Sequence, residues 1–322
     1  MERARDWLAD LRHGVEYLVF RALVCFVQSL SARRTDALAR GLGFVIHRCL
    51  PRKVSRYQVA YDNLRTAFGD RYSDAELDAM IGRMWVHLFR VVAEIAQMPR
   101  KLHRENLREV ISYRNREGVV RAMSSGRPVI LLSGHYGNWE VAVSVFGLFG
   151  FPMGVVAREL DNPYLDAWFR QFRECTGHLM VDKNGGYATM LSMLESRGHL
   201  AMLGDQDAGS RGLFVDFFGK PASTFKSIAL LAMQYRAVIC VGYARRLPDD
   251  FDNRNWVRYE LGCEAVIDPE SIDADDVLRE ITQQYTSALE RVVRRSPEQY
   301  FWVHRRWKNQ PGARKRRGRR AA

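Results

Sequence analysis

The sequence predicts an α/β fold in which helices flank a central, largely parallel or mixed sheet, preceded by a helical N-terminal segment. Three observations carry this prediction. The chain has 322 residues, 47% hydrophobic and 27% charged, which suffices for a sizeable core and excludes collagen-like, wholly disordered and polytopic membrane classes. Its first third shows the apolar period of helices. From about residue 118, short apolar runs alternate with helical stretches, as strands and helices in turn would produce.

The N-terminal segment bears on whether the chain contacts a membrane. Residues 15–30 are mostly apolar, but Glu16 and Arg21 interrupt them, whereas a membrane-spanning helix needs about 20 apolar residues with few charges. One sector of a helix would gather the polar residues Asp10, His13, Arg21 and Gln28. We therefore predict that residues 1–30 form a membrane-associating helix lying shallowly in the interface. An ordinary core helix is the alternative, and Arg21 disfavours a cleaved signal peptide.

Residues 31–117 are expected to be the helical part of one domain. Ser73 and Glu76 form a capping-box pattern, in which the hydroxyl and the carboxylate each accept the other residue's backbone amide. The pattern predicts the start of a long amphipathic helix. We expect Pro99 to end this helix, because proline lacks the amide that would continue it.

Residues 118–308 are expected to form the α/β core of the same domain. The apolar runs assigned to its strands are 128–133, 152–157, 179–182, 200–205, 237–244 and 256–267. A final helix is expected at about 274–294. The five cysteines are scattered without a C-x-x-C pair, which excludes a zinc ribbon and favours a reducing compartment.

Basic residues gather at the C-terminal end. The chain has 49 Lys and Arg against 37 Asp and Glu, a net charge of +12. Residues 291–322 hold twelve of these basic residues and one acidic residue, so the other 290 residues are nearly neutral. We expect a disordered basic tail over 309–322 that is attracted to anionic lipid head groups. Non-specific binding of nucleic acid is one alternative, and a solvated tail without a partner is another.

The strongest local signal is the segment from Pro128 to Glu140, where an apolar strand runs into Ser-Gly and then His135. Sites in open α/β sheets lie at the carboxyl ends of strands. His135 and Glu140 are five residues apart and could not meet on one regular helix. With His135 on a loop, Gly137 at the bend and Glu140 in the first helical turn, the carboxylate can fix the imidazole tautomer while the other nitrogen takes a proton. The pattern predicts a general-base pair. No G-x-S-x-G or H-E-x-x-H motif points to a serine nucleophile or a zinc site.

Three further blocks follow in order along the chain. They read ARELDNPYLD (157–166), GDQD with GLFVDFFGKP (204–221), and PEQYFWVHRRWK (297–308). Together with SGHYGNWE (133–140), they make the sequence resemble the bacterial lipid A late acyltransferases, the lauroyl/myristoyl branch of the glycerolipid acyltransferase superfamily. The resemblance spans about residues 118–308, and the helical N-terminal third also suits that family.

The resemblance implies a membrane-associated acyltransferase at the cytoplasmic face of the inner membrane, bound peripherally or monotopically. It would move an acyl chain from acyl carrier protein or acyl-CoA to a hydroxyl of a glycolipid, and a lipid A precursor is the first candidate for this acceptor. His135 would act as the base and Glu140 would orient it, with no metal and no cofactor. The alternatives are another glycolipid or lysolipid as acceptor, and a non-catalytic protein that binds lipid or nucleic acid.

The resemblance also suggests roles for other residues. Arg158 would stabilise the oxyanion or hold an acceptor phosphate, with backbone amides near Gly134 or Gly137 as the alternative oxyanion donors. The aromatic residues Phe214, Phe217 and Phe218 are candidates either for an acyl-chain tunnel or for the core. The carboxylates of Asp205 and Asp207 would arrange the site by hydrogen bonds, magnesium being the less favoured reading. The candidates for substrate contact are Asn138, Asn162, Asp166, Asp205, Gln206, Asp207, Thr224, His304, Arg305 and Arg306.

Overall fold

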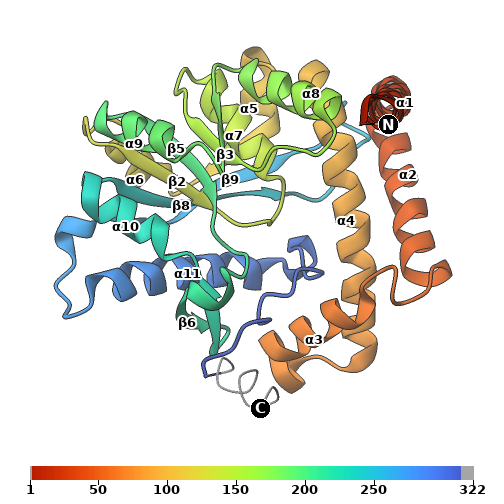
Figure 1. Ribbon diagram of the computed structural model, residues 1–322. Coiled ribbons are helices and arrows are strands. Elements are labelled where there is room, and N and C mark those ends of the chain that lie inside the picture. The colour runs from red at the N-terminus through yellow and green to blue at the C-terminus, as the bar shows by residue number, and fades with distance from the viewer. Residues whose placement is uncertain (1, 313–322) are drawn as a thin grey trace.

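In the computed structural model, which describes residues 2–312, a seven-stranded mixed sheet lies between helical layers (Figure 1). The strand order is β1-β9-β8-β2-β5-β3-β4, and every pair is parallel except β8 with β9. The predicted α/β class is confirmed. The strands are β1 (Ile111–Arg114), β2 (Val129–Ser133), β3 (Gly154–Ala157), β4 (Leu179–Asp182), β5 (His199–Leu203), β8 (Val238–Arg246) and β9 (Tyr259–Ile267). A separate antiparallel pair, β6 (Leu213–Phe217) and β7 (Lys220–Thr224), was not predicted from the sequence.

Alternation along the central strand β2 divides the core between the two faces of the sheet. Ile130 and Leu132 pack in one cluster with α10 (Lys226–Tyr235) and α11 (Val277–Arg295). Val129 and Leu131 face the other way, toward α6 (Arg116–Met123) and α7 (Trp139–Leu148). Successive side chains of a strand point to opposite faces, so a strand covered on both sides reads as a continuous apolar run. The remaining core helices are α5 (Leu107–Val110), α8 (Pro163–Glu174) and α9 (Tyr187–Glu195).

The helical third supplies a long support beside the sheet. It contains α2 (Ala32–Phe44), α3 (Tyr57–Phe68) and α4 (Asp74–Lys101). The capping box predicted at the start of α4 is present, with Ser73 and Glu76 each accepting the other's amide. The predicted end at Pro99 is wrong by two residues, because Pro99 lies in the last turn, where its missing amide removes only one helical hydrogen bond.

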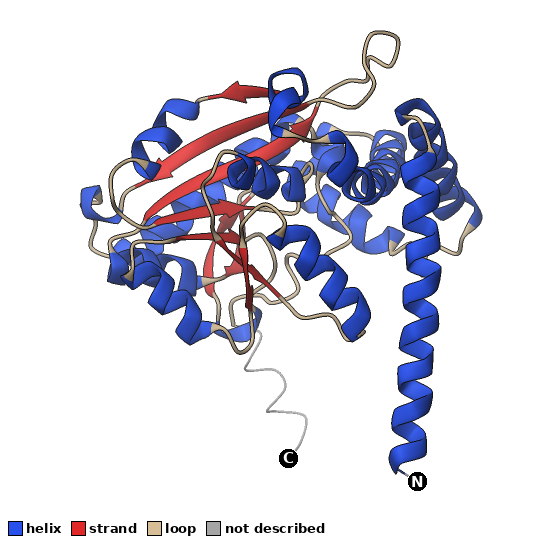
Figure 2. Ribbon diagram, turned by 90° about the horizontal axis from the view of Figure 1, so that it is seen from above, coloured by secondary structure: helices blue, strands red, loops and turns tan. Residues whose placement is uncertain are grey.

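The N-terminal segment is one helix, α1 (Glu2–Ser29), that docks its polar side on the protein. The Asn162 amide donates to the carbonyl of His13 at 3.0 Å, and the Tyr164 hydroxyl donates to Asp10 at 2.9 Å. Phe20 meets the edge of Trp168, with ring centroids 4.9 Å apart. Figure 2 shows α1 along the edge of the molecule, its N-terminal turns extending past the α/β core.

The opposite side of α1 is apolar and faces outward. Its exposed hydrophobic residues are Trp7, Leu8, Leu11, Val15, Leu18, Val19, Leu23 and Phe26, which we call the outer stripe. Over residues 2–312, no helix is both long enough and apolar enough to cross a bilayer. Most of the basic tail predicted at 309–322 lies outside the described residues.

Candidate active site

The loop between β2 and α7 places His135 at the carboxyl end of the central strand. Asn138 caps α7, its side-chain oxygen accepting the amide of Val141 at 3.3 Å. Gly137 has a φ of 59°, and a Cβ at this position would lie 2.0 Å from the carbonyl oxygen of Ala244. Only glycine therefore permits the bend, as expected from the sequence.

Hydrogen bonds from two distant parts of the chain, the C-terminal segment and α4, hold this loop. The Gly137 amide donates to Gln299 at 3.0 Å, and the Phe301 amide donates to the carbonyl of His135 at 3.0 Å, so the C-terminal segment pins both sides of the turn. The buried imidazole of His87 on α4 contacts the Gly137 carbonyl through Nε2 at 3.1 Å. Burial lowers the pKa of His87 to about 3, so this ring is neutral and its Nε2 donates.

His135 is held by Asp205, not by Glu140. The Asp205 carboxylate accepts His135 Nδ1 at 2.9 Å through one oxygen and the His135 amide at 2.8 Å through the other. β2 and β5 are parallel neighbours with Ser133 opposite Leu203, so positions 135 and 205 lie equally far beyond the two strand ends. Gly134 allows the close approach, because a Cβ there would lie 3.1 Å from Asp205. Asp205 is 4% exposed.

The predicted contact between His135 and Glu140 is not made. Glu140 lies in the first turn of α7, which directs its carboxylate to Arg173 on α8. The two form a bidentate pair with nitrogen–oxygen distances of 2.6 and 3.0 Å. A buried carboxylate needs such a partner, and the Asp205 carboxylate already occupies His135 Nδ1.

The charges around His135 suit a general base. Burial would raise the pKa of Asp205, but the charge and hydrogen bonds of His135 outweigh it and hold that pKa at about 2. Burial likewise opposes protonation of His135, yet the carboxylates of Asp205 and Glu140 outweigh it and raise the pKa of His135 above its ordinary 6.5. Asp205 therefore stays ionised and keeps a proton on Nδ1. Above the raised pKa, Nε2 is free to accept a proton.

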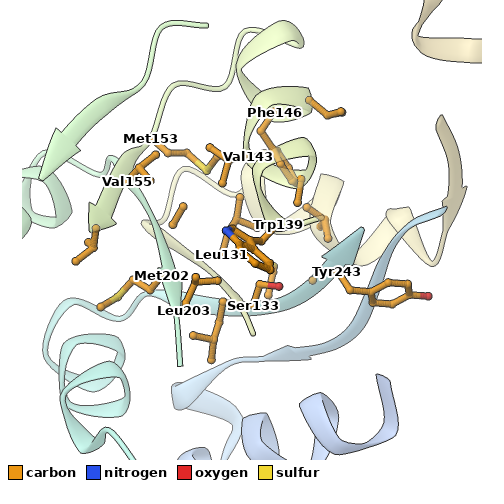
Figure 3. A pocket seen from close by; sticks show the side chains of 18 of the residues that line it. Leu131, Ser133, Trp139, Val143, Phe146, Met153, Val155, Met202, Leu203 and Tyr243 are labelled. Atoms are coloured by element: carbon orange, nitrogen blue, oxygen red, sulfur yellow. The ribbon is translucent and has the colours of Figure 1, made fainter. Parts of the chain in front are cut away.

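His135 lines a cavity of about 1370 Å³ at this edge of the sheet. Its walls are mainly apolar side chains from β2, β3, β5, α6 and α7, among them Leu131, Val143, Phe146 and Met202, together with Met153 just before β3 (Figure 3). Trp139 stands beside the base, its ring 5.1 Å from the imidazole, centroid to centroid. Small-molecule pockets usually measure about 300–1,000 Å³, so this cavity can take a long apolar chain together with a polar group.

Three other predicted site residues, Glu140, Gln206 and Arg158, line the cavity. Gln206 follows Asp205 directly. Arg158 lies at the rim, with a side chain that is 69% exposed and that pairs, among residues 2–312, only with Asp161 at 2.8 Å. Phe217 and Phe218 instead pack in the core cluster with α3 and α4, and none of the three candidate tunnel phenylalanines lines the cavity.

Most of the remaining candidates for substrate contact serve the fold. Arg306 is buried and donates to the Ser223 carbonyl and to Thr224, and His304 Nε2 accepts the Asp207 amide at 2.9 Å. Each of these side chains is thus occupied by an internal partner, because the C-terminal segment closes over β7 and the loop after β5. The predicted residues that do not line the cavity are Asn138, Asn162, Asp166, Asp205, Asp207, Thr224, His304, Arg305 and Arg306; of these, Asp205 meets the site through His135, and Arg305 is exposed.

The magnesium reading of Asp205-Gln206-Asp207 finds no support in the carboxylates. Both oxygens of Asp205 are taken by His135. Asp207 accepts a hydrogen bond from the Gly209 amide at 2.9 Å. It also accepts hydrogen bonds from the backbone amide of Asn309 at 3.2 Å and from the Asn309 side chain at 2.6 Å. Every oxygen of the two carboxylates thus accepts a hydrogen bond from within the protein.

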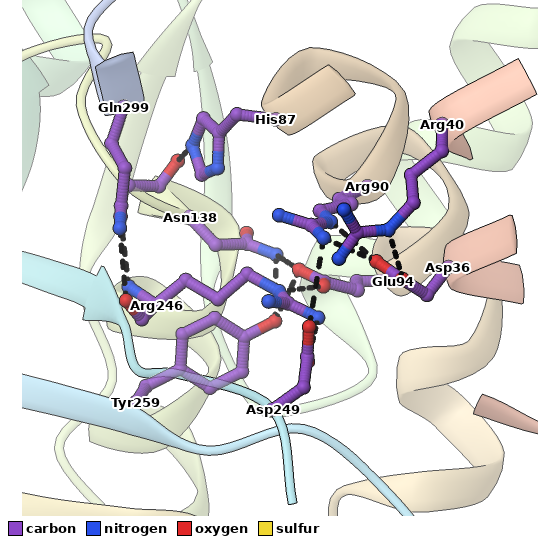
Figure 4. Close-up of polar contacts among 11 residues, drawn as sticks. Asp36, Arg40, His87, Arg90, Glu94, Asn138, Arg246, Asp249, Tyr259 and Gln299 are labelled. Carbon is purple, nitrogen blue, oxygen red and sulfur yellow. Dashed lines mark hydrogen bonds and ion pairs between the residues drawn. The ribbon is translucent and has the colours of Figure 1, made fainter. Parts of the chain in front are cut away.

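Behind the loop, α4 and β8 join through a buried charged cluster (Figure 4). Arg246 binds Glu94 at 2.6 Å and Asp249 at 2.6 Å, and Glu94 also accepts the Tyr259 hydroxyl and the Asn138 amide. The cap of α7 is thereby tied to the helical third of the molecule. Neither the pairing of Glu94 with Arg246 nor that of Glu140 with Arg173 was found by sequence reasoning, since each joins segments far apart in the chain.

We expect Arg246→Met to lower the free energy of unfolding by about 3–5 kcal/mol, because it leaves the Glu94 carboxylate buried without its cation. Urea unfolding of the purified protein measures this. Arg33→Met is the matched control, since Arg33 pairs with Asp252 in an exposed ion pair whose loss should cost no more than about 1 kcal/mol. Equal losses for the two variants would show that the buried cluster has no special weight.

Comparisons with known proteins identify the family of this chain. The family model described as bacterial lipid A biosynthesis acyltransferase matches residues 7–309. The chain is 25% identical to a lipid A biosynthesis acyltransferase of Haemophilus influenzae, over 90% of this chain and 85% of that protein. It is 24% identical to the lipid A biosynthesis lauroyltransferase of Escherichia coli K12, over 95% and 93%. A phosphatidylinositol mannoside acyltransferase of Mycobacterium tuberculosis is 27% identical over 54% of this chain and 53% of its own. The chain therefore belongs to the bacterial lipid A biosynthesis acyltransferase family and is an acyltransferase.

Proposed function

We propose that this protein is a membrane-associated O-acyltransferase that moves a fatty acyl chain from a thioester to a hydroxyl of a glycolipid, most directly a lipid A precursor. The thioester donor is acyl carrier protein or acyl-CoA. The observation that carries the proposal is His135, backed by the ionised Asp205 and lining a large apolar cavity. Acyl-transfer chemistry with a lipid chain needs both a base and an apolar chamber beside it.

In this mechanism the acceptor hydroxyl gives its proton to His135 Nε2, and Asp205 stabilises the imidazolium that forms. The hydroxyl oxygen attacks the thioester carbonyl carbon directly. The new C–O bond turns the carbonyl into a tetrahedral intermediate whose oxygen carries the negative charge. When the C=O bond re-forms, the C–S bond breaks, and the leaving sulfur takes the proton back from His135. Glu140 adds negative charge that favours the imidazolium, while its hydrogen bonds hold Arg173.

The oxyanion of this reaction needs a hydrogen-bond donor. The amides of His135, Tyr136, Gly137 and Asn138 all donate within the protein, to Asp205, Gly134, Gln299 and Ala244 respectively. The backbone alternative at Gly137 therefore fails. Arg158 and the backbone amide of Gly134 remain as candidates, and Arg158 is favoured because its exposed pairing with Asp161 is weak enough to exchange for a substrate oxygen.

The acyl chain of the donor would occupy the apolar part of the cavity. Each methylene removed from water there contributes about 0.8 kcal/mol, so a long chain supplies much of the binding energy. The acceptor is the less determined partner, because relatives of this chain carry names with two different glycolipids. Another glycolipid is therefore the second candidate.

Mass spectrometry of lipids from cells with and without the gene tests the proposal. A glycolipid heavier by one acyl chain only when the gene is present is the expected result, and its fragments would identify acceptor and chain. An unchanged glycolipid profile in cells that make the folded protein would contradict the proposal.

Association with the membrane would rest on α1. The polar side of α1 packs on the protein, and its apolar residues are exposed to solvent. Burying these residues in the lipid interface would stabilise the membrane-bound state of the protein. Leu11 and Leu18 lie in the outer stripe and are half or more exposed.

We expect Leu11→Glu with Leu18→Glu to release much of the protein into the high-salt supernatant of a membrane fraction without unfolding it. Sedimentation followed by immunoblotting measures the distribution. Leu230→Glu is the control, because Leu230 is also exposed but lies on α10, across the molecule from α1 (Figure 1). Full retention of the double variant in the pellet would place the membrane contact elsewhere.

A further inference from the structure

Two cationic residues stand side by side at the rim of the cavity. Arg158 follows β3 and Lys183 follows β4, and these parallel strands pair with Ala157 opposite Asp182. The Lys183 amide donates to the Ala157 carbonyl at 2.8 Å, which continues the pairing past the strand ends. Both side chains line the cavity that His135 lines. Lys183 belongs to none of the four sequence blocks, and only the pairing of the strands brings it here.

The charge of Lys183 has no neutralising partner among residues 2–312. Its ammonium lies 4.8 Å from the ring centroid of Phe225, and no carboxylate of the described chain forms an ion pair with it. The acidic residues adjacent in sequence to Lys183 and to Arg158 contact other groups. Asp182 accepts the Gly185 amide at 2.8 Å, and Glu159 lies 3.6 Å from Arg170. Arg173, in contrast, is fully matched by Glu140.

The charge of Lys183, which no carboxylate among the described residues neutralises, makes His135 a weaker base. Burial and the charge of Lys183 both lower the pKa of His135, in opposition to the two carboxylates that raise it. Lys183 thus disfavours the imidazolium on which the reaction depends. A bound anion beside Lys183 would cancel this effect.

We propose that Lys183, with Arg158 beside it, binds a phosphate group carried by one of the two substrates. The inference rests on the proposed function. A phosphate reaches this site either on the glycolipid head group or on the phosphopantetheine arm of the thioester donor. A lysine supplies a point charge and an arginine a planar fork, a pairing well suited to phosphate oxygens.

Steady-state kinetics of Lys183→Met, with two matched substrate pairs, tests the proposal. One pair is the glycolipid acceptor with and without its phosphate, and the other is an acyl phosphopantetheine thioester and the acyl pantetheine thioester. Rates are taken at alkaline pH, where His135 is unprotonated in both proteins, so that a shift of its pKa has no influence. Lys220→Met is the control, because Lys220 is exposed on β7 and does not line the cavity.

We expect Lys183→Met to raise KM about 10- to 100-fold for one phosphorylated substrate and not for its phosphate-free counterpart, with Lys183→Arg restoring most of the loss. The affected pair identifies which substrate brings the phosphate. The phosphate site would be overturned if the KM values stayed within about twofold of wild type for all four substrates, or if KM rose equally with and without phosphate. In either case, a normal rate of the wild type would still support the proposed function. No transfer by the wild type with any pair would overturn the proposed function and the phosphate site with it.

Discussion

His135→Ala is expected to lower the rate of acyl transfer by about 10²- to 10⁴-fold while leaving the protein folded. The imidazole can take the acceptor proton near neutral pH, since its Nε2 remains available and Asp205 supports the charge that forms. The loss should appear in kcat, because the proton moves in the transition state. Product formation is followed by mass spectrometry with a defined donor and acceptor.

His199→Ala is the matched control for this variant. His199 begins β5, at the opposite end of the same strand from Asp205, and it does not line the cavity. Its removal should leave the rate within a few-fold of wild type. A folded His135→Ala protein that turns over at a near-normal rate would exclude His135 as the base.

Asp205→Asn is expected to lower kcat by about 10²- to 10⁴-fold. Losses of this size follow when an uncharged amide replaces the carboxylate that supports a catalytic histidine. An asparagine oxygen can still accept one hydrogen bond, but it carries no charge to stabilise the imidazolium. Its amide group can also donate to Nδ1 and so select the wrong tautomer.

Glu140→Gln separates Asp205 from the partner predicted by the sequence spacing. Glu140 contacts Arg173 and influences His135 only through its charge, so we expect a loss of about tenfold or less. A larger loss for Glu140→Gln than for Asp205→Asn would mean that Glu140 moves onto His135 during the reaction.

Much of the fold could be predicted because its signals are local. The apolar runs of β2 to β5 and β8, the capping box before α4 and the glycine bend at Gly137 each follow from a few neighbouring residues. β1, of four residues, and the β6–β7 pair were missed, because short strands that lie beside polar turns carry little apolar pattern.

The partner of His135 could not be predicted from spacing alone. Glu140 is near in the sequence, whereas Asp205 is 70 residues away and meets His135 only because β5 lies beside β2 in the sheet. The same reason hid Lys183, which β4 brings next to Arg158. Side chains that are far apart in the sequence become neighbours at the carboxyl edge of a parallel sheet through the order of the strands. That order cannot be predicted from a few neighbouring residues.

The pH dependence of kcat/KM for the wild type, Asp205→Asn and Glu140→Gln tests most directly the central claim, that Asp205 supports His135 as the base. Activity of the wild type should fall as the pH drops through the raised pKa of His135, above 6.5. Removing a carboxylate removes an interaction that raises this pKa, so the acid limb should move to lower pH, far for Asp205→Asn and slightly for Glu140→Gln. An acid limb that stays in place in Asp205→Asn but moves in Glu140→Gln would contradict the claim.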